Sequence, residues 1–249
     1  MNIAVCIGNV PDTTTRIRFA DNLTRFDTTG VQWIINPWDE LALTRALEIR
    51  EQTGSGVQKV TVVHVGTTAG DPTIRKALAI GADDAVRVNA EAMDAFQIAF
   101  QLASLFRNES YDIILCGVET SDYNNSAVGG MLSELLDYTS VSAVSYCSVE
   151  NERIMVHRDI DGGREIISVQ PPVVLIVQKG IAREPRIPSM RGIMMSKQKP
   201  LRIVDPVQVE PLTEYESFEM PPQKAACRKI DPDNVKELVD LLHNEAKVI

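Results

Sequence analysis

The chain has 249 residues, 44% of them hydrophobic, which is enough to bury a full core. Its formal net charge of -9 argues against a protein that neutralises nucleic-acid phosphates or anionic membranes, and no apolar stretch is long enough to span a bilayer. The amino terminus does not resemble a signal peptide and the four cysteines form no C-x-x-C pair, so we expect a reduced, cytoplasmic protein without disulfides or a zinc site.

Strands and helices alternate over the first 140 residues. Continuous apolar, β-branched runs predict strands buried on both faces at 2–7, 59–65, 85–88 and 111–117. Amphipathic runs predict helices at 36–54, 71–81, 94–108 and 128–136. Asn36 and Asp71 are the expected N-caps of the first two helices. This alternation is typical of βαβ units, so we predict an α/β fold with a doubly wound, mostly parallel sheet of the adenine-nucleotide-binding type.

The hydrophobic pattern changes after residue 140. Residues 141–149, 153–160 and 164–169 predict antiparallel strands, with a turn at 161–163, and another buried strand follows within 171–180. We expect a β-hairpin layer and a closing central strand in the same domain, which covers residues 1–199.

Residues 200–249 predict an extended C-terminal arm. The stretch 204–223 is acidic, punctuated by proline and short of core residues, which is typical of an arm rather than a folded layer. The chain ends in a predicted helix with one apolar stripe, made of Val235, Leu238, Val239 and Leu242. Such an arm either folds back on its own core or embraces a second chain.

Three of the predicted strands end in glycine-containing loops. Gly8, Gly66 and Gly117 should therefore lie on one edge of the sheet, where open parallel sheets hold their ligands. The third loop, "CGVETSDYNNSAVGG" at 116–130, leads into a helix whose free N–H groups and dipole suit a phosphate. The alternative is that these small residues only permit a tight turn. Three such loops on one edge favour a ligand of nucleotide size.

The usual motifs of bond-making chemistry are missing. The sequence has no G-x-G-x-x-G after the first strand, no G-x-x-x-x-G-K-[ST], no H-E-x-x-H and no G-x-S-x-G. The three histidines are scattered and are expected to be structural or surface residues. These absences indicate a protein that holds a nucleotide without cleaving it, and that is not an enzyme.

Several segments together resemble the beta subunit of electron-transfer flavoproteins, over nearly the full chain. They are "NPWDELALTRALEIRE", "TIRKALAIGADDAVRV", "DYNNSAVGGMLSELLDY", "HRDIDGGREIISVQPPVVLIV" and "EPRIPSMRGIMMSKQKP". The resemblance implies a heterodimer with an alpha subunit that holds most of the redox FAD, while this subunit buries an AMP without a redox role. It also implies acyl-CoA or other flavin dehydrogenases as electron donors, in fatty acid beta-oxidation, and a quinone oxidoreductase as acceptor.

The same resemblance assigns roles to single residues. Cofactor contacts are implied at Cys6, Asn36, Pro37, Trp38, Asp39, Val65, Gly66, Gly117, Glu119, Asp122, Tyr123, Asn124, Asn125, Ser126, Ala127 and Val128. Trp38 matches an aromatic position that faces the flavin of the alpha subunit. Met190 matches an apolar anchor for dehydrogenases, and Asp159 matches an acid that pairs with an arginine of the alpha subunit. Apart from the resemblance, the apolar character of Met194 and Met195 predicts that they fill the core.

The chain departs from the family's usual phosphate loop at two positions. Asn124 stands where the pattern has an acid, and Ala127 where it has a glutamine. We expect the N–H groups of 125–129 to bind the phosphate and Asp122 to accept from backbone N–H groups. Two alternatives stay open: a bifurcating flavoprotein with a second FAD in place of AMP, and a stand-alone adenine-nucleotide sensor or nucleotide-hydrolysing enzyme.

Overall fold

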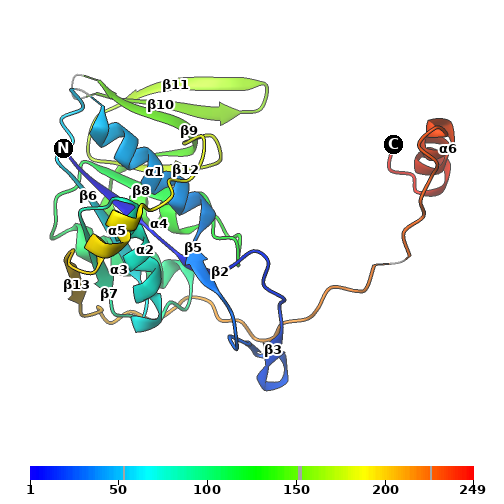
Figure 1. Ribbon diagram of the computed structural model, residues 1–249, viewed down its shortest axis with the longest axis horizontal. Coiled ribbons are helices and arrows are strands. Elements are labelled where there is room, and N and C mark those ends of the chain that lie inside the picture. The colour runs from blue at the N-terminus through cyan, green and yellow to red at the C-terminus, as the bar shows by residue number, and fades with distance from the viewer. Residues whose placement is uncertain (53, 151–152, 225) are drawn as a thin grey trace.

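One nine-stranded sheet forms the centre of the computed structural model, which describes residues 1–52, 54–150, 153–224 and 226–249 (Figure 1). Its strand order is β11-β10-β9-β12-β8-β1-β6-β7-β13. Seven of these strands have at least one parallel neighbour: β1 (Asn2–Cys6), β6 (Lys59–Val65), β7 (Asp84–Val88), β8 (Ile113–Gly117), β9 (Thr139–Glu150), β12 (Val173–Val177) and β13 (Leu201–Val204). The chain builds first to one side of β1 and then to the other, which confirms the predicted doubly wound sheet.

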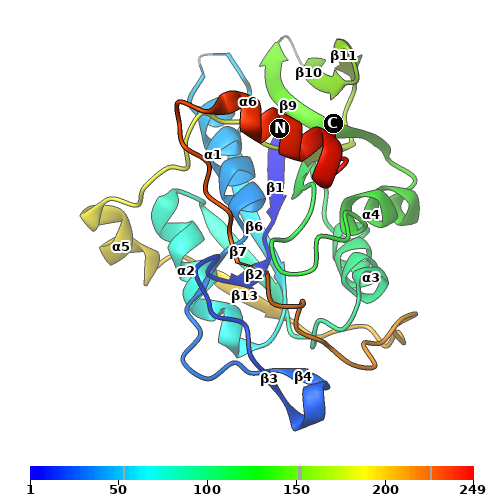
Figure 2. The same cartoon turned by 90° about the vertical axis from the view of Figure 1, so that its right-hand side faces the viewer.

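Two pairs of helices cover the two faces of this sheet (Figure 2). On one face lie α1 (Pro37–Glu51) and α2 (Asp71–Ile80), and on the other lie α3 (Ala95–Phe106) and α4 (Val128–Leu136). Burial on both faces explains why the central strands are continuous apolar runs rather than alternating ones. A short 3-10 helix, η2 (Thr68–Gly70), precedes α2.

The capping residues of α1 and α2 differ from the prediction. Asn36 is at the N-cap position of α1, but its side chain makes no capping hydrogen bond. Asp71 is wrong as a cap, since Gly70 is the N-cap of α2 and the Asp71 carboxylate instead pairs with Arg87. In both cases a tertiary partner attracts the side chain away from its own helix end.

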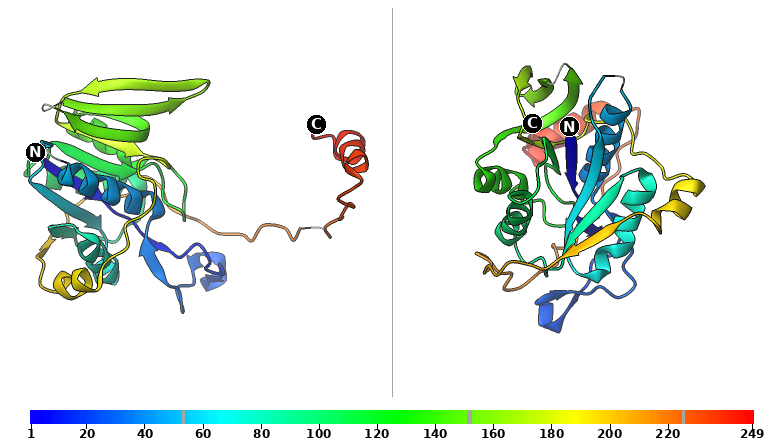
Figure 3. Two further views of the ribbon diagram at one scale, coloured as in Figure 1. Left: turned by 45° about the horizontal axis from the view of Figure 1, so that its top comes forward. Right: turned by 90° about the vertical axis from the view of Figure 1, so that its left-hand side faces the viewer.

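The strands of the predicted hairpin layer lie in the same domain, where they continue the main sheet (Figure 3). The strand β9 (Thr139–Glu150) pairs in parallel with β12, and β10 (Arg153–Ile160) and β11 (Gly163–Val169) continue the sheet as antiparallel neighbours. β12 lies between β8 and β9, so its entirely buried sequence fits a central strand.

Residues 9–35 form an excursion that the sequence patterns did not predict. In it β2 (Asn9–Pro11) pairs with β5 (Trp33–Ile35), and β3 (Phe19–Ala20) pairs with β4 (Arg25–Phe26) around the 3-10 helix η1 (Asp21–Leu23). Strands of two or three residues are too short to show a periodic pattern.

The C-terminal arm begins later than residue 200. β13 adds to the sheet beside β7, and the chain then crosses the domain before running out to α6 (Val235–Asp240) and a π-helical turn (Leu241–Glu245), which stand clear of the body (Figure 1). The apolar stripe of α6 is exposed at Val235, Leu238 and Val239. Among the described residues, none of the helices has the length and apolar character to cross a membrane.

Candidate functional site

A cavity of about 730 Å³ opens at the carboxyl ends of the central strands, where the strand order reverses between β1 and β8. This is the place where open α/β sheets hold ligands, and the volume suits a small organic molecule. Its walls come from the ends of β1, β6 and β8, the loop 117–128, the start of α3 and the excursion 9–35.

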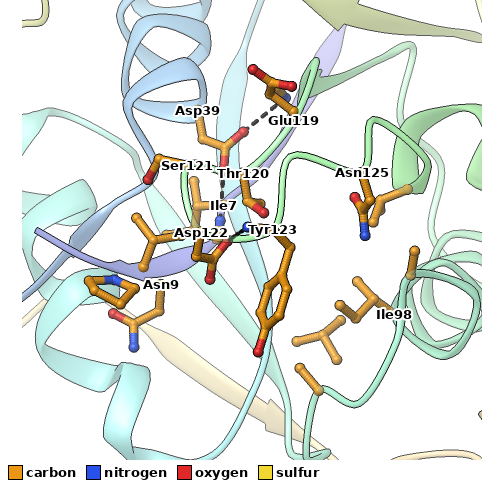
Figure 4. Close-up of a pocket in the computed structure, with 18 of the residues that line it drawn as sticks. Ile7, Asn9, Asp39, Ile98, Glu119, Thr120, Ser121, Asp122, Tyr123 and Asn125 are labelled. Atoms are coloured by element: carbon orange, nitrogen blue, oxygen red, sulfur yellow. Dashed lines mark hydrogen bonds between the residues drawn. The ribbon is translucent and has the colours of Figure 1, made fainter. Parts of the chain in front are cut away.

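Asp39 ties the two central strand ends together from the first turn of α1 (Figure 4). Its Oδ2 accepts from the N–H of Gly8 at 2.8 Å, and its Oδ1 accepts from the N–H of Gly117 at 2.8 Å. The side chain lines the cavity yet is almost fully buried. Burial raises the pKa of the Asp39 carboxyl to about 6, although hydrogen bonds from Gly8, Asn36 and Gly117 favour the charged form.

This raised pKa predicts a specific pH dependence. The folded chain binds the Asp39 proton more tightly than the unfolded chain, so the carboxyl contributes stability at low pH that is lost as the pH rises through about 6. Relative to Asp39→Asn, the wild-type free energy of unfolding should rise by roughly 1.4 kcal/mol between pH 7 and pH 5. Denaturant unfolding of both proteins at each pH measures this, and a difference independent of pH would contradict it.

Asn36 shapes the loop that follows β8. It is fully buried, its side-chain amide donates to the carbonyl oxygen of Glu119 at 2.8 Å, and its Oδ1 accepts from the N–H of Ser121 at 3.2 Å. Asn124 and Ser126 adopt φ angles of 50° and 49°, in the left-handed region, so the chain turns sharply before α4. A buried side chain and this unusual backbone together give the loop one defined shape.

The end of this loop offers free backbone donors. No intramolecular acceptor occurs, within the part of the chain that the structure describes, for the N–H groups of 125–128, and α4 begins at Val128. Asn125, Ala127 and Val128 line the cavity, which is the geometry expected of a helix-terminus anion site. Asp122 Oδ1 accepts from the N–H of the adjacent Tyr123 at 2.9 Å.

The structure places most of the expected contact residues at the cavity. Those that line it are Cys6, Asp39, Val65, Gly117, Glu119, Asp122, Tyr123, Asn125, Ala127 and Val128. The others are outside its lining: Asn36, Pro37, Trp38, Gly66, Asn124 and Ser126. Asn36 is behind the cavity lining and fixes the loop 117–128 through its hydrogen bonds to Glu119 and Ser121. Gly66 lies over the ring of His64, where a Cβ would come within 2.2 Å of Nε2.

Some cavity residues were not anticipated. They include Asn9, His64, Met93, Asp94, Ile98, Tyr215 and Phe218, together with an aromatic end made of Phe19, Phe26 and Trp33. Asn9 directly follows Gly8, which is predicted to lie on the ligand-binding edge of the sheet, so the sequence could have indicated Asn9 as a cavity residue. Tyr215 and Phe218 come from the arm, and no local pattern connects them to strands about one hundred residues earlier.

His64 lies in the cavity wall and is held by the main chain. It is buried, and its Nδ1 lies 2.8 Å from the carbonyl oxygen of Ile7. Burial lowers the pKa of the imidazole, so it stays neutral at physiological pH. Within the described ranges, no group of three or more His, Cys, Asp or Glu side chains is placed to hold a metal ion.

The two residues expected at partner surfaces, Met190 and Asp159, are outside the cavity lining. Met190 begins α5 (Met190–Ser196) and is 77% exposed, and Met194 and Met195 are exposed beside it, so their expected place in the core is wrong. The reason is that Gly192 packs directly on α2, which turns the methionines outward: a Cβ there would lie 2.4 Å from the Ala79 carbonyl oxygen.

Asp159 is on β10 and is held by its own chain. Its carboxylate accepts from Ser145 Oγ at 2.8 Å, from Arg164 Nε at 2.9 Å and from Gln178 Nε2 at 3.0 Å. Arg164 and the other donors lower the pKa of Asp159, so it is charged at neutral pH.

The sheet is doubly wound, and its cavity lies where the strand order reverses. These two features place the protein in the class of open α/β-sheet proteins that bind ligands in the crevice at that point. Comparison with known proteins narrows this class. Residues 24–209 match the family model described as the electron transfer flavoprotein domain. The beta subunit of the electron transfer flavoprotein of Bacillus subtilis is 33% identical, with 100% of both chains covered.

Two further relatives are named in the same way. The beta subunit of Syntrophomonas wolfei is 32% identical over 100% of this chain and 98% of its own, and that of Homo sapiens is 30% identical over 93% of each. The chain belongs to the electron transfer flavoprotein family, among relatives of its beta subunit.

Proposed function

We propose that this chain is the beta subunit of a heterodimeric electron transfer flavoprotein and binds AMP in the cavity at the strand ends. The observation that carries the proposal is the set of free N–H groups at 125–128, which lie at the cavity and at the start of α4. A phosphate there gains hydrogen bonds and the favourable end of the helix dipole. Asp39 and Asn36 keep this donor set in place, although they touch the backbone rather than the phosphate.

The charges around the cavity favour a nucleoside monophosphate. Its acidic lining residues are Asp12, Asp39, Asp94, Glu119 and Asp122, and within the described ranges neither lysine nor arginine lines it. Every additional phosphate would therefore add negative charge without a cation from this chain. The same lack of cations argues against the nucleotide-hydrolysing alternative, because phosphoryl transfer depends on such charges.

A second FAD is the other candidate, and one observation favours it. The cavity continues from the phosphate loop to the aromatic end at Phe19, Phe26 and Trp33, which suits a planar ring system. Its pyrophosphate would then need cations from a partner.

Acid extraction of the purified heterodimer distinguishes these candidates. We expect about one AMP and about one FAD per heterodimer, as the family stoichiometry implies. Two FAD and no AMP would indicate the bifurcating form. One FAD and no other nucleotide would mean that the loop is only a turn.

The partner roles follow from the same proposal. The alpha subunit would hold most of the FAD, which supplies the electron-carrying chemistry, and Trp38 would face it. The exposed stripe of α6 at Val235, Leu238 and Val239 would lie on the alpha subunit, because an apolar helix face is stable only when it is covered. Asp159 would exchange Arg164 for an arginine of the alpha subunit. Flavin dehydrogenases would donate electrons and a quinone oxidoreductase would accept them.

Met190 provides a test of the donor surface. We expect Met190→Asp to slow electron transfer from a flavin dehydrogenase about tenfold, because a charge replaces an exposed, adaptable apolar contact. FAD content and flavin spectrum should not change. Met131→Asp, at another exposed methionine, on α4, is the matched control. Equal rates in the two variants would remove Met190 from the interface.

A further inference from the structure

A segment of the C-terminal arm crosses the cavity and is tied down on both sides of it. We call this segment, residues 212–218, the strap. Its first two N–H groups donate to Asp94 Oδ2 at 2.7 and 2.9 Å. At its far end the N–H of Phe218 donates to the carbonyl oxygen of Leu23, in the excursion, at 2.7 Å. The strap therefore bridges the start of α3 and the excursion, which are separate walls of the cavity.

Four aromatic rings continue this bridge to the phosphate loop. Phe19 of the excursion stacks on Phe218 with ring centroids 4.9 Å apart. Phe218 stacks on Tyr215 at 5.6 Å, and Tyr215 stacks on Tyr123 of the loop at 4.8 Å. All four residues line the cavity, and Figure 4 shows Tyr123 extending from the loop beside Asp122. Rings at these separations attract one another, so the stack forms a continuous part of the cavity wall.

The strap is more exposed than the strand ends on the opposite side of the cavity. Tyr215 is 50% exposed, and Leu212 at its start is 69% exposed, whereas the strand ends opposite are buried. A segment with few buried apolar contacts opens at a much lower free energy than the core. The strap is therefore a part of the wall that can move without unfolding the domain.

We propose that the strap is the movable wall of the nucleotide site, and that Tyr215 and Phe218 retain the bound nucleotide by closing its exit. This proposal rests on the proposed function, since it needs a nucleotide in the cavity. The arm thus has a role at the ligand site of its own domain before it reaches any partner. Release of the nucleotide then requires the stacks at Tyr123 and Phe19 to separate.

The release rate of AMP tests the proposal. The full-length heterodimer is loaded with radiolabelled AMP and chased with excess unlabelled AMP. Tyr215→Ala combined with Phe218→Ala should release the label at least tenfold faster than wild type, because two stacked contacts are lost. Met220→Ala is the matched control, since Met220 is an exposed arm residue just beyond the strap that does not line the cavity. It should release AMP at the wild-type rate.

Hydrogen exchange of the wild-type heterodimer gives a second readout that needs no variant. The amides at 212, 213 and 218 should exchange at least tenfold more slowly with AMP bound, because the ligand supports the closed strap. Two results would contradict the proposed role of the strap while leaving AMP binding intact. One is an equal AMP release rate in the double variant and in Met220→Ala, and the other is amide hydrogen exchange in the strap that AMP does not change. A wild-type heterodimer that binds no AMP would contradict both the proposed AMP binding and the proposed role of the strap.

Discussion

Replacing Asp71 by alanine should lower the free energy of unfolding by about 3–5 kcal/mol, because Arg87 would keep a buried charge without its counter-ion. Arg87 is 1% exposed, and its Nε lies 2.8 Å from Asp71 Oδ1, although the N–H does not point directly at that oxygen. Its remaining contacts are neutral: Nη1 donates to the Gly66 carbonyl oxygen at 3.1 Å and to Asn89 Oδ1 at 2.6 Å. Urea unfolding of the variant and the wild type measures the loss.

Two comparisons isolate the buried charge as the cause. Asp71→Ala combined with Arg87→Leu should recover most of the loss, because the unpaired charge is gone. Arg25→Ala breaks an ion pair with Asp21 that is largely exposed, and it should cost under about 1 kcal/mol. If Asp71→Ala lowers the free energy of unfolding no more than Arg25→Ala does, the Arg87 guanidinium is in contact with water and the explanation is wrong.

Gly117→Ala should destabilise the protein by about 2–4 kcal/mol and abolish nucleotide retention. A Cβ at this position would lie 2.4 Å from Asp39 Oδ1 and 2.8 Å from Trp38 Cβ. The carboxylate would have to move, and it is the acceptor for the N–H groups of both Gly8 and Gly117. Thermal unfolding and acid extraction of the purified protein measure the two effects.

Gly130→Ala is the matched control, further along the chain in the helix that follows the same loop. Gly130 is exposed in α4. Apart from its chain neighbours and the backbone of its own helix, no atom of the described residues lies within 4 Å of the point that a Cβ would occupy, so alanine there meets open space. Alanine also has the better helix propensity, and we expect a gain of about 0.5–1 kcal/mol. If both variants lose similar stability, the close approach at Gly117 is not the cause.

The periodicity of the sequence by itself determined the alternating strands and helices. Runs such as Asn2–Cys6 and Val173–Val177 can be buried on both faces only in a central, parallel strand. The run of small residues before Val128 likewise predicted a loop that leaves N–H groups free at a helix start. These are local properties, because the spacing of apolar residues and the size of side chains act within a few residues.

Only the tertiary structure decided which side chains serve the site. Asn36 and Asp71 look like helix caps in the sequence, but their partners come from a distant loop and a neighbouring strand. Tyr215 reaches the cavity because β13 returns the chain to the sheet edge, and nothing near Tyr215 specifies that pairing. A buried polar group takes the partner that the fold places beside it, and that partner is set by contacts between segments far apart in the chain.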